Sequence, residues 1–496
     1  MTLVLLLAVP LVASALVLAL PPRHAIPTAV AATGGTLAIA VIAAARFDYG
    51  SAHAMQQGVD WAWIPPIDVR LHLGIDGISL PLVVLTALLT ALCAIYLGRR
   101  EAPELARPRA FVALLLLLEV GMLGTFVALD LLVFFVFFEL VLVPMYAVIA
   151  GWGGPGRRPA ANQFILYTLL GSGVLLVGLL VIYAQTGTLD MVVLAARAGD
   201  GLSHTVQVIA FLLVAGGLAV KVPMWPLHSW LPDAHTEAPT VGSVLLAGVL
   251  LKMGTYGMVR IAVPVLPEGA LFWAPWLGAL GVVGIVYAAL ACLAQRNLKR
   301  LVAFSSVGHM GFVLLGIATL TPVGMNAALF ANIAHGLITG LLFFLAGGIA
   351  QRYGGTDMAT IGGGLLAKAP HLGSLLVLAS VASLGLPGLA GFWGEMLAML
   401  SAFQPAPGLD RGLFLGFMAI AGLGAVLTAA YFLVMIRRVA HGVAPPRWHG
   451  VGLLDATGRE LLAWAPLVLF AFVAGLWPRV LLGVTDPAVR ALLGGG

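Results

Sequence analysis

Two of the four lysines in this chain, Lys221 and Lys252, lie inside apolar runs that are long enough to form helices. A charge near the centre of a lipid bilayer costs roughly 2.5–3.5 kcal/mol on insertion scales, so such a residue is expected to face the protein interior and to have a function. Four prolines lie between the two lysines and must interrupt the helix: Pro223, Pro226, Pro232 and Pro239. A lysine just before a broken membrane helix is typical of an ion site in a transporter.

Two acidic residues, Glu139 and Glu395, also have apolar surroundings. Glu139 is the natural partner for Lys221, because burial disfavours the charged form of each group whereas a mutual ion pair favours it. These opposing effects allow a site whose protonation changes when its neighbour moves, as a proton carrier requires. The alternatives are a Glu139 that is neutral or paired only for assembly, a Glu395 at a helix start near the surface, and a Lys252 that reaches the membrane interface.

Two histidines, His309 and His335, lie in successive apolar segments between the lysines and Glu395. Histidine can pass protons near neutral pH, although a lone histidine in an apolar helix is more often a hydrogen-bonded core group. We therefore expect a proton relay of six residues: Glu139, Lys221, Lys252, His309, His335 and Glu395. Four residues after the first break are interpreted as loop structure or as the place where protons enter from the cytoplasm: His228, Asp233, His235 and Glu237. Glu119 is another intramembrane acid, and it is interpreted either as a point of proton entry or as a residue that contributes to helix packing.

The composition indicates a polytopic membrane protein. Hydrophobic residues make up 61% of the 496 residues and charged residues 9%, against about 25% charged in ordinary soluble domains. The pI near 9.4 does not indicate nucleic-acid binding, because no basic run exceeds a few residues. Cys93 and Cys292 lie in apolar segments, which argues against a disulfide framework or a metal site. The chain has no P-loop, dinucleotide-binding glycine motif, CxxC pair or haem-attachment motif, so no cofactor is expected in it.

Fourteen spans are expected when about 20 apolar residues are allowed for each bilayer crossing. They are approximately 2–20, 27–45, 78–97, 110–128, 131–150, 161–185, 205–222, 239–262, 271–293, 301–319, 324–349, 372–400, 413–436 and 460–482. The seventh and twelfth spans are expected to be broken, at Pro223 and Pro387. The loop 46–77 is expected outside the membrane, with a short strand pair in its WAWIPPIDVRLHL portion.

The sequence also shows signs of an internal repeat. Asn162 and Asn326 are 164 positions apart, as are Pro223 and Pro387, and GTLDM at 187–191 is similar to GTDM at 355–358. Spans 4–8 are therefore predicted to correspond to spans 9–13, and an odd number of spans per repeat inverts the second copy. The predicted fold is all-α, with two inverted five-helix repeats. Four units are predicted. Residues 1–109 form three helices and the loop 46–77, and residues 110–262 form the first repeat. Residues 271–436 form the second repeat, and residues 437–496 form the C-terminal loop and the last helix.

Basic residues in the short loops predict the orientation, because they are enriched on the cytoplasmic side. With the N-terminus outside, the inside loops carry sixteen of the 25 lysines and arginines, Arg99 and Arg100 among them, and the outside carries seven. Both termini are therefore predicted to be outside, in the periplasm of a bacterium.

Four stretches resemble a known family: IDGISLPLVVLT at 75–86, VPMWPLHSWLPDAHTEAPTVGSVLLAGVLLKMGTYG at 222–257, QRNLKRLVAFSSVGHMG at 295–311 and GLPGLAGFWGEM at 385–396. They are similar to the antiporter-like subunit M of bacterial proton-pumping NADH:quinone oxidoreductase, respiratory complex I, which corresponds to mitochondrial subunit 4. The resemblance covers essentially all fourteen spans and implies a proton-translocating subunit of the membrane arm. By motif, it implies an ion pair of Glu139 with Lys221, a central Lys252, connecting histidines His309 and His335, and a terminal Glu395.

The resemblance also implies where the rest of the chemistry lies. NADH, FMN, iron–sulfur clusters and quinone are expected in partner subunits, and the partners are neighbouring antiporter-like and small subunits in the bacterial inner membrane. The nearest alternative is a multisubunit Na⁺/H⁺ antiporter, in which the corresponding chain generally has lysine where this chain has Glu395. A membrane-bound hydrogenase and a ferredoxin-linked relative of complex I are further alternatives. A purely structural anchor is disfavoured, because it gives no reason for buried charges.

Overall fold

The computed structural model describes residues 1–98, 106–449 and 452–494. Thirteen helices within these ranges are long and apolar enough to cross a membrane. A fourteenth crossing is supplied by two half-helices, α19 (Pro370–Ser383) and α20 (Ala390–Phe403), where the sequence predicts the second broken span. The predicted all-α polytopic fold is confirmed. Arg99 and Arg100, which contribute to the predicted orientation, lie outside the described residues.

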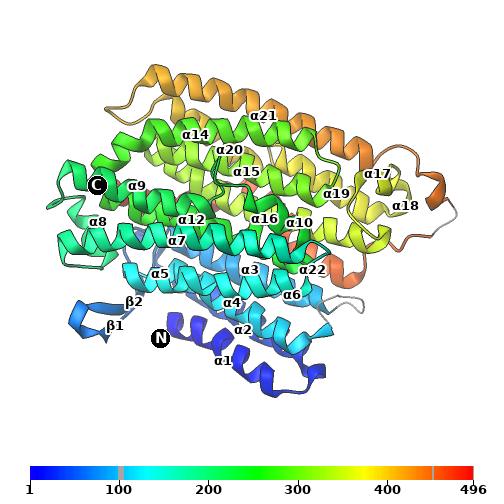
Figure 1. Ribbon diagram of the computed structural model, residues 1–496, viewed down its shortest axis with the longest axis horizontal. Helices are drawn as coiled ribbons and strands as arrows, with labels where there is room; N and C mark the ends of the chain where they lie inside the picture. Colours follow the sequence, from blue (N-terminus) through cyan, green and yellow to red (C-terminus); the bar gives the residue numbers. More distant parts are fainter. Residues whose placement is uncertain (99–105, 450–451, 495–496) are drawn as a thin grey trace.

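The remaining helices follow in chain order (Figure 1). The first ten are α1 (Thr2–Ala19), α2 (Ala25–Ala45), α3 (Ser79–Leu97), α4 (Pro108–Val127), α5 (Leu131–Leu140), α6 (Leu142–Trp152), α7 (Arg157–Thr186), α8 (Met191–Arg197), α9 (His204–Lys221) and α10 (Trp230–Glu237). The others are α11 (Thr240–Leu245), α12 (Leu251–Gly257), α13 (Val263–Val265), α14 (Pro267–Leu293), α15 (Leu298–Ala318), α16 (Pro322–Tyr353), α17 (Met358–Ile361), α18 (Leu365–Lys368), α21 (Arg411–Val439), α22 (Gly458–Leu476) and α23 (Arg479–Leu492).

The span with Lys252 lies at the centre of the bundle. Two π-helical segments, Leu246–Leu250 and Met258–Ala262, join α11, α12 and α13 into one crossing, Thr240–Val265. Every residue in the most apolar window of this crossing is buried, whereas only 28% of the corresponding window of α1 is buried. The helix with the costliest charge is therefore shielded from lipid by other helices.

Both predicted helix breaks are present. α9 ends at Lys221 because Pro223 cannot donate a main-chain hydrogen bond, and helix resumes at Trp230. In the second break, Gly385 and Gly388 have φ values of +82° and +94°, which only glycine adopts without strain.

A third interruption was not predicted. The helix stops between α5 and α6 at Val141, because Pro144 in the first turn of α6 has no N–H for the carbonyl one turn earlier. This break places a helix C-terminus, with its unpaired carbonyls, inside the membrane-spanning segment Leu131–Trp152.

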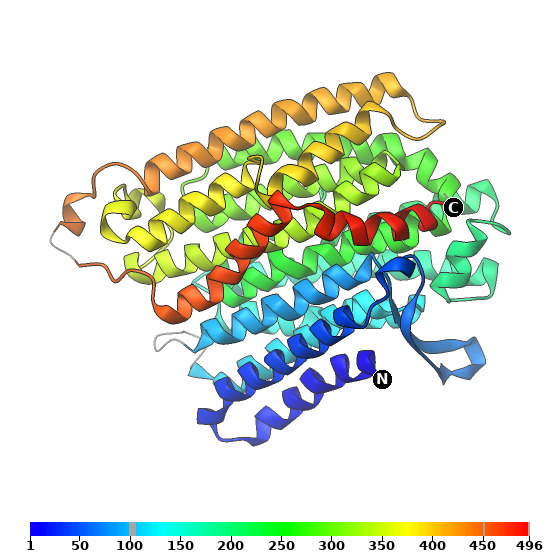
Figure 2. The same cartoon turned by 180° about the vertical axis from the view of Figure 1, so that it is seen from behind.

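The predicted strand pair is confirmed as an antiparallel hairpin of β1 (Gln56–Ile64) and β2 (Val69–Ile75). It projects from one end of the bundle, and both chain termini lie at this same end in both views (Figures 1 and 2). An even number of crossings requires this arrangement of the termini.

Two matching joints connect helices at opposite ends of the bundle. Asp130 forms an isolated antiparallel bridge with Asp190, and Asn297 forms one with Asp357, at the same spacing along the chain. All four side chains also cap helices that start next to them: α5, α8, α15 and α17. α8 lies at the end with the sheet and α17 at the other (Figure 1). The predicted repeat would produce this pattern, although the residue-by-residue correspondence stays a prediction.

Candidate functional site

Lys252 lies in the first turn of α12 and is fully buried. Its Nζ donates to the carbonyl of Ala247, within the π-helical segment, where the regular helical hydrogen bonds are disturbed. Its Nζ is also 2.6 Å from Nδ1 of His335 on α16. The side chain therefore turns into the bundle rather than toward an interface.

His335 and His309 continue the line from Lys252. Their ring centroids are 5.6 Å apart in an edge-to-face arrangement, and Nε2 of His335 is buried without a hydrogen-bond partner among the described residues. A cavity of about 20 Å³ is lined by both rings together with Thr339, Ser383 and Glu395. This volume holds one water molecule, and the polar lining offers it partners.

The second broken span supplies both partners of His309. Nδ1 of His309 is 3.1 Å from Oε1 of Glu395, in the second turn of α20. Its Nε2 is 3.0 Å from the hydroxyl of Ser383, the last residue of α19. Because the break brings the end of one half-helix beside the start of the other, both groups reach the same imidazole ring.

Lys221 and Glu139 lie close together without forming a contact ion pair. Lys221 donates a 2.8 Å hydrogen bond to the carbonyl of Phe138 and lies 3.5 Å from the centroid of that residue's ring. Glu139 accepts a hydrogen bond from Ser172 on α7. Glu139 still attracts the Lys221 charge, but none of their nitrogen–oxygen distances is 4.0 Å or less. The carbonyl of Phe138 is available because it belongs to the last turn of α5.

Four of the six predicted residues thus form one line, and two stand apart from it. Lys252, His335, His309 and Glu395 are consecutive neighbours. No hydrogen bond or ion pair links Lys221 to Lys252, although α9 and α12 pack together.

The interpretation of His235 as loop structure is wrong. It lies on α10 with no solvent exposure, and neither ring nitrogen has a hydrogen-bond partner among the described residues. Its ring stacks on Phe343 of α16 at 4.5 Å, and the charges of Lys252 and Lys299 both act on it. The sequence spacing could have revealed this helix, because Leu231 and His235 are four residues apart and therefore lie on the same helix face.

The other residues of that cluster have separate partners. Asp233 pairs with Arg300 at 3.0 Å near the surface, and Glu237 accepts the N–H of Gly156 at 2.8 Å. His228 packs its ring edge-to-face against Tyr287, with ring centroids 4.9 Å apart. Entry of protons from the cytoplasm at these residues stays a prediction. Within the described ranges no three His, Cys, Asp or Glu residues gather as a metal site.

Glu119 stands apart from the line. It is fully buried in α4, with the side chain of Thr90 on α3 beside its carboxylate. No hydrogen bond or ion pair within the described ranges joins Glu119 to any of the six predicted relay residues.

Comparison with known proteins identifies the family. A family model described as "NADH:quinone oxidoreductase/Mrp antiporter, TM" matches residues 128–421, more than half of the chain. The chain belongs to this family. NAD(P)H-quinone oxidoreductase chain 4 of Gloeobacter violaceus is 40% identical over 437 residues, which are 87% of this chain and 81% of that protein. NADH-quinone oxidoreductase subunit M of Rhodobacter capsulatus is 38% identical, over 95% of this chain and 91% of that protein.

A solved structure agrees with these relatives over the whole chain. One chain of "Respiratory complex I from Thermus thermophilus with bound NADH" superposes with a TM-score of 0.88 at 30% identity, covering 100% of both chains. The resemblance to the antiporter-like subunit M is therefore confirmed, and the chain is a multi-pass membrane protein of this family.

Proposed function

We propose that this chain is a proton-translocating membrane subunit of an NADH:quinone oxidoreductase. Protons would move along Lys252, His335, His309 and Glu395. The observation that carries the proposal is the continuity of this line, with contacts of 2.6 Å and 3.1 Å at its ends and a water-sized cavity lined by both histidines. In this sense the chain acts within an enzyme complex without a redox centre of its own.

Each group in the line can accept a proton on one side and release it on the other. One nitrogen of His335 faces Lys252 and the other is free to bond a water in the cavity. An imidazole that gains a proton at one nitrogen can lose one at the other. Ser383 lines the cavity and contacts Nε2 of His309, so its hydroxyl can take a proton from a cavity water and give its own proton to that nitrogen. Glu395 receives the proton from Nδ1 of His309.

The gap between Lys221 and Glu139 provides a switch. When the two approach, Glu139 neutralises the charge of Lys221, and a proton on Lys252 becomes less unfavourable. When they separate, the uncompensated charge on Lys221 opposes protonation of Lys252. A small movement at the α5–α6 break, where Phe138 now holds Lys221, would therefore change the charge of Lys252.

The source of energy lies in partner subunits. The chain carries no nucleotide or cluster motif, so NADH, FMN, iron–sulfur clusters and quinone belong to other subunits. Glu139 is only half-buried although it belongs to a membrane span, and a neighbouring antiporter-like subunit would cover it. The charge bias of the loops favours both termini on the periplasmic side of the bacterial inner membrane.

The test is Lys252→Met in the assembled complex, reconstituted in vesicles. NADH-driven proton translocation is expected to fall about tenfold or more, because the line loses its first titratable group. Lys368→Met is the matched control, because Lys368 lies outside the line on α18. Normal translocation in the Lys252 variant, with assembly intact, would contradict the proposal.

Sodium–proton exchange is the alternative, because the family description includes Mrp antiporters. Vesicles without NADH distinguish the two. A sodium gradient that drives proton movement through the subunit would favour the antiporter, whereas movement that requires NADH oxidation favours the oxidoreductase.

A further inference from the structure

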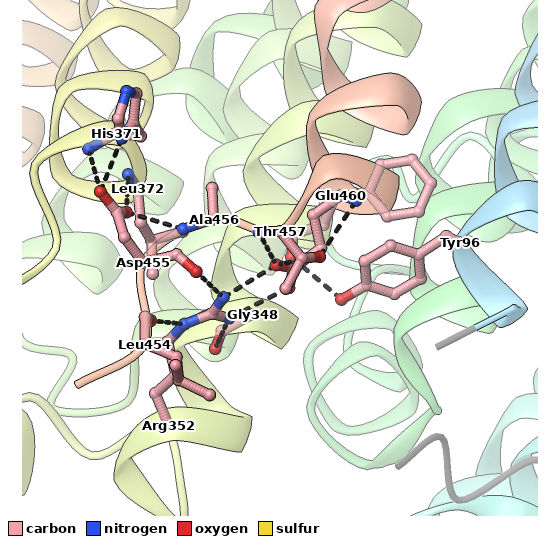
Figure 3. Close-up of polar contacts among 11 residues, drawn as sticks. Tyr96, Gly348, Arg352, His371, Leu372, Leu454, Asp455, Ala456, Thr457 and Glu460 are labelled. Carbon is pink, nitrogen blue, oxygen red and sulfur yellow. Dashed lines mark hydrogen bonds and ion pairs between the residues drawn. The ribbon is translucent and has the colours of Figure 1, made fainter. Parts of the chain in front are cut away.

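Arg352 binds the stretch 454–460, which leads into α22 (Figure 3). It lies in the last turn of α16 and donates to the carbonyls of Leu454 at 2.5 Å and Asp455 at 2.9 Å. It also holds both carboxylate oxygens of Glu460, at 3.0 Å and 2.8 Å. A planar guanidinium bound to a carboxylate through two hydrogen bonds gives a fixed geometry as well as a strong contact.

The side chain of Asp455 caps a different helix. Its carboxylate accepts the N–H groups of His371 at 2.9 Å and Leu372 at 3.0 Å, in the first turn of α19, and that of Ala456 at 2.7 Å (Figure 3). One oxygen also lies 2.7 Å from Nδ1 of His371. Burial raises the pKa of Asp455, but these hydrogen bonds outweigh it and lower the pKa to about 2, so the cap is ionised at neutral pH.

Glu460 completes the arrangement in the first turn of α22. It forms a capping box with Thr457, and the same carboxylate holds Arg352. Arg352, Asp455 and Glu460, called here the inner clamp, therefore join the ends of α16, α19 and α22. Among the described residues, the charged or titratable groups in contact with Asp455 are His371 of α19 and Arg352 of α16.

The inner clamp lies far from the proton line but is connected to it by stiff helices. α19 has 14 residues and is therefore about 21 Å long. Asp455 holds its first turn, and its last residue, Ser383, contacts His309. α16, which Arg352 holds, carries His335. The clamp therefore fixes how far α19 extends relative to α16, and with it the place of the Ser383 hydroxyl.

We propose that Asp455 is a positioning residue for His309, acting through α19 and Ser383. With Ser383 bonded to Nε2, the imidazole keeps Nδ1 toward Glu395 and its ring edge toward His335. Without the cap, α19 can shift along its axis, and His309 loses its fixed orientation. This inference rests on the proposed function, because it concerns the same line of groups.

The experiment compares the pH profile of NADH-driven proton translocation in assembled complexes carrying Asp455→Ala, Ser383→Ala or both. Asp455→Ala is expected to lower translocation about fivefold, because the loss of one helix cap changes an equilibrium constant by about this factor. It is also expected to shift the pH profile in the same direction as Ser383→Ala. If Asp455 acts through Ser383, the double variant matches Ser383→Ala alone.

Asp410→Ala is the matched control. Asp410 caps α21 by accepting the N–H of Leu413 at 3.1 Å, and α21 carries none of the groups in the line. Its pH profile is expected to be unchanged. If the Asp455→Ala complex does not assemble, the pH profile of Asp455→Asn is measured instead. This variant keeps one acceptor oxygen, and a profile shifted as in Ser383→Ala is again the expected result.

The outcomes separate the two claims. A shifted profile in Ser383→Ala with a normal one in the Asp455 variants overturns the inference and leaves the proposed function standing. A lower amount of complex with an unchanged profile also overturns it, because the role of Asp455 is then merely structural. Normal translocation in Ser383→Ala and in Lys252→Met would overturn the proposed function itself.

Discussion

The two halves of the bundle hold their buried charges by different means. In the first half, Lys221 donates to the main-chain carbonyl of Phe138, and Lys252 donates to that of Ala247. Both carbonyls lie where a helix is interrupted or loosened, at the end of α5 and in the first π-helical segment. In the second half, His309 is held by two side chains, those of Glu395 and Ser383.

The difference shows how a sequence can keep cations in a membrane and still let protons move. A carbonyl accepts a hydrogen bond from a lysine but cannot take its proton, so the carbonyl of Phe138 holds the charge of Lys221 in place, whereas Lys252 also contacts the imidazole of His335. Imidazole and carboxylate groups can exchange protons, which is the property that the proposed line in the second half requires. His335 links the two, because it belongs to α16 and contacts Lys252.

The largest effect on stability is expected where the first half is anchored by a buried ion pair. Arg260, two turns after Lys252, is 2.6 Å from Asp76, and both side chains are less than 5% exposed. Arg260→Ala leaves Asp76 buried without its partner, which costs about 3–5 kcal/mol. Arg490→Ala is the control, because its pair with Asp486 is exposed and contributes less than about 1 kcal/mol. Denaturant unfolding of the purified subunit measures both, and equal losses would contradict the expectation.

Phe138→Leu tests whether a main-chain carbonyl is enough to hold Lys221. The variant removes the ring 3.5 Å from Nζ but keeps the carbonyl. Losing a desolvated cation–π contact costs about 2 kcal/mol, while proton translocation is expected to stay within about twofold of normal, because the hydrogen bond remains. A loss as severe as that of Lys252→Met would show that the ring, rather than the backbone, holds the charge.

The smallest effects are expected at the two matching joints. Asp190 accepts two N–H groups of α8, and Asp357 caps α17 through Thr360. Replacing either by Ala is expected to cost about 1 kcal/mol, because the cap is lost. Only the first joint carries a histidine, because His72 on β2 lies 2.9 Å from Asp190.

That histidine gives the first joint a pH dependence. The hydrogen bond to Asp190 raises the pKa of His72 above 6.5. The pair's contribution is therefore fully present below about pH 6.5 and is lost as the pH rises through the raised pKa. Melting temperatures measured between about pH 6 and pH 9 should show this loss in the wild type and not in Asp190→Asn. Asp357→Asn should retain it, and a flat wild-type curve would contradict the assignment.

The relay of six residues stays a prediction, although the structure brings four of them into one line. The sequence alone predicts the spans, the two proline-associated breaks and the strand pair. These succeed because the cost of a charge or a proline in an apolar helix is local and visible in the sequence. The repeat and the domain boundaries derived from it stay predictions, supported by the paired joints at Asp130–Asp190 and Asn297–Asp357.

Other features depend on tertiary structure. The sequence suggests a carboxylate partner for Lys221, but the group that Lys221 contacts is a main-chain carbonyl, which no residue type reveals. The break at Val141 could have been predicted from Pro144, since that proline lies within an apolar run as Pro223 does. The prolines around His235 suggest a loop, although α10 turns its ring toward Phe343.

The central claim is that the second half conducts protons through side chains, and Glu395→Gln tests it most directly. The substitution keeps the shape of the side chain and a hydrogen-bond acceptor for His309 but removes the group that takes up the proton. Protons translocated per NADH oxidised are measured in vesicles, with the exposed Glu268→Gln as control. The account predicts fewer protons per NADH in the Glu395 variant and an unchanged ratio in the control. An unchanged ratio in an intact Glu395→Gln complex would contradict it.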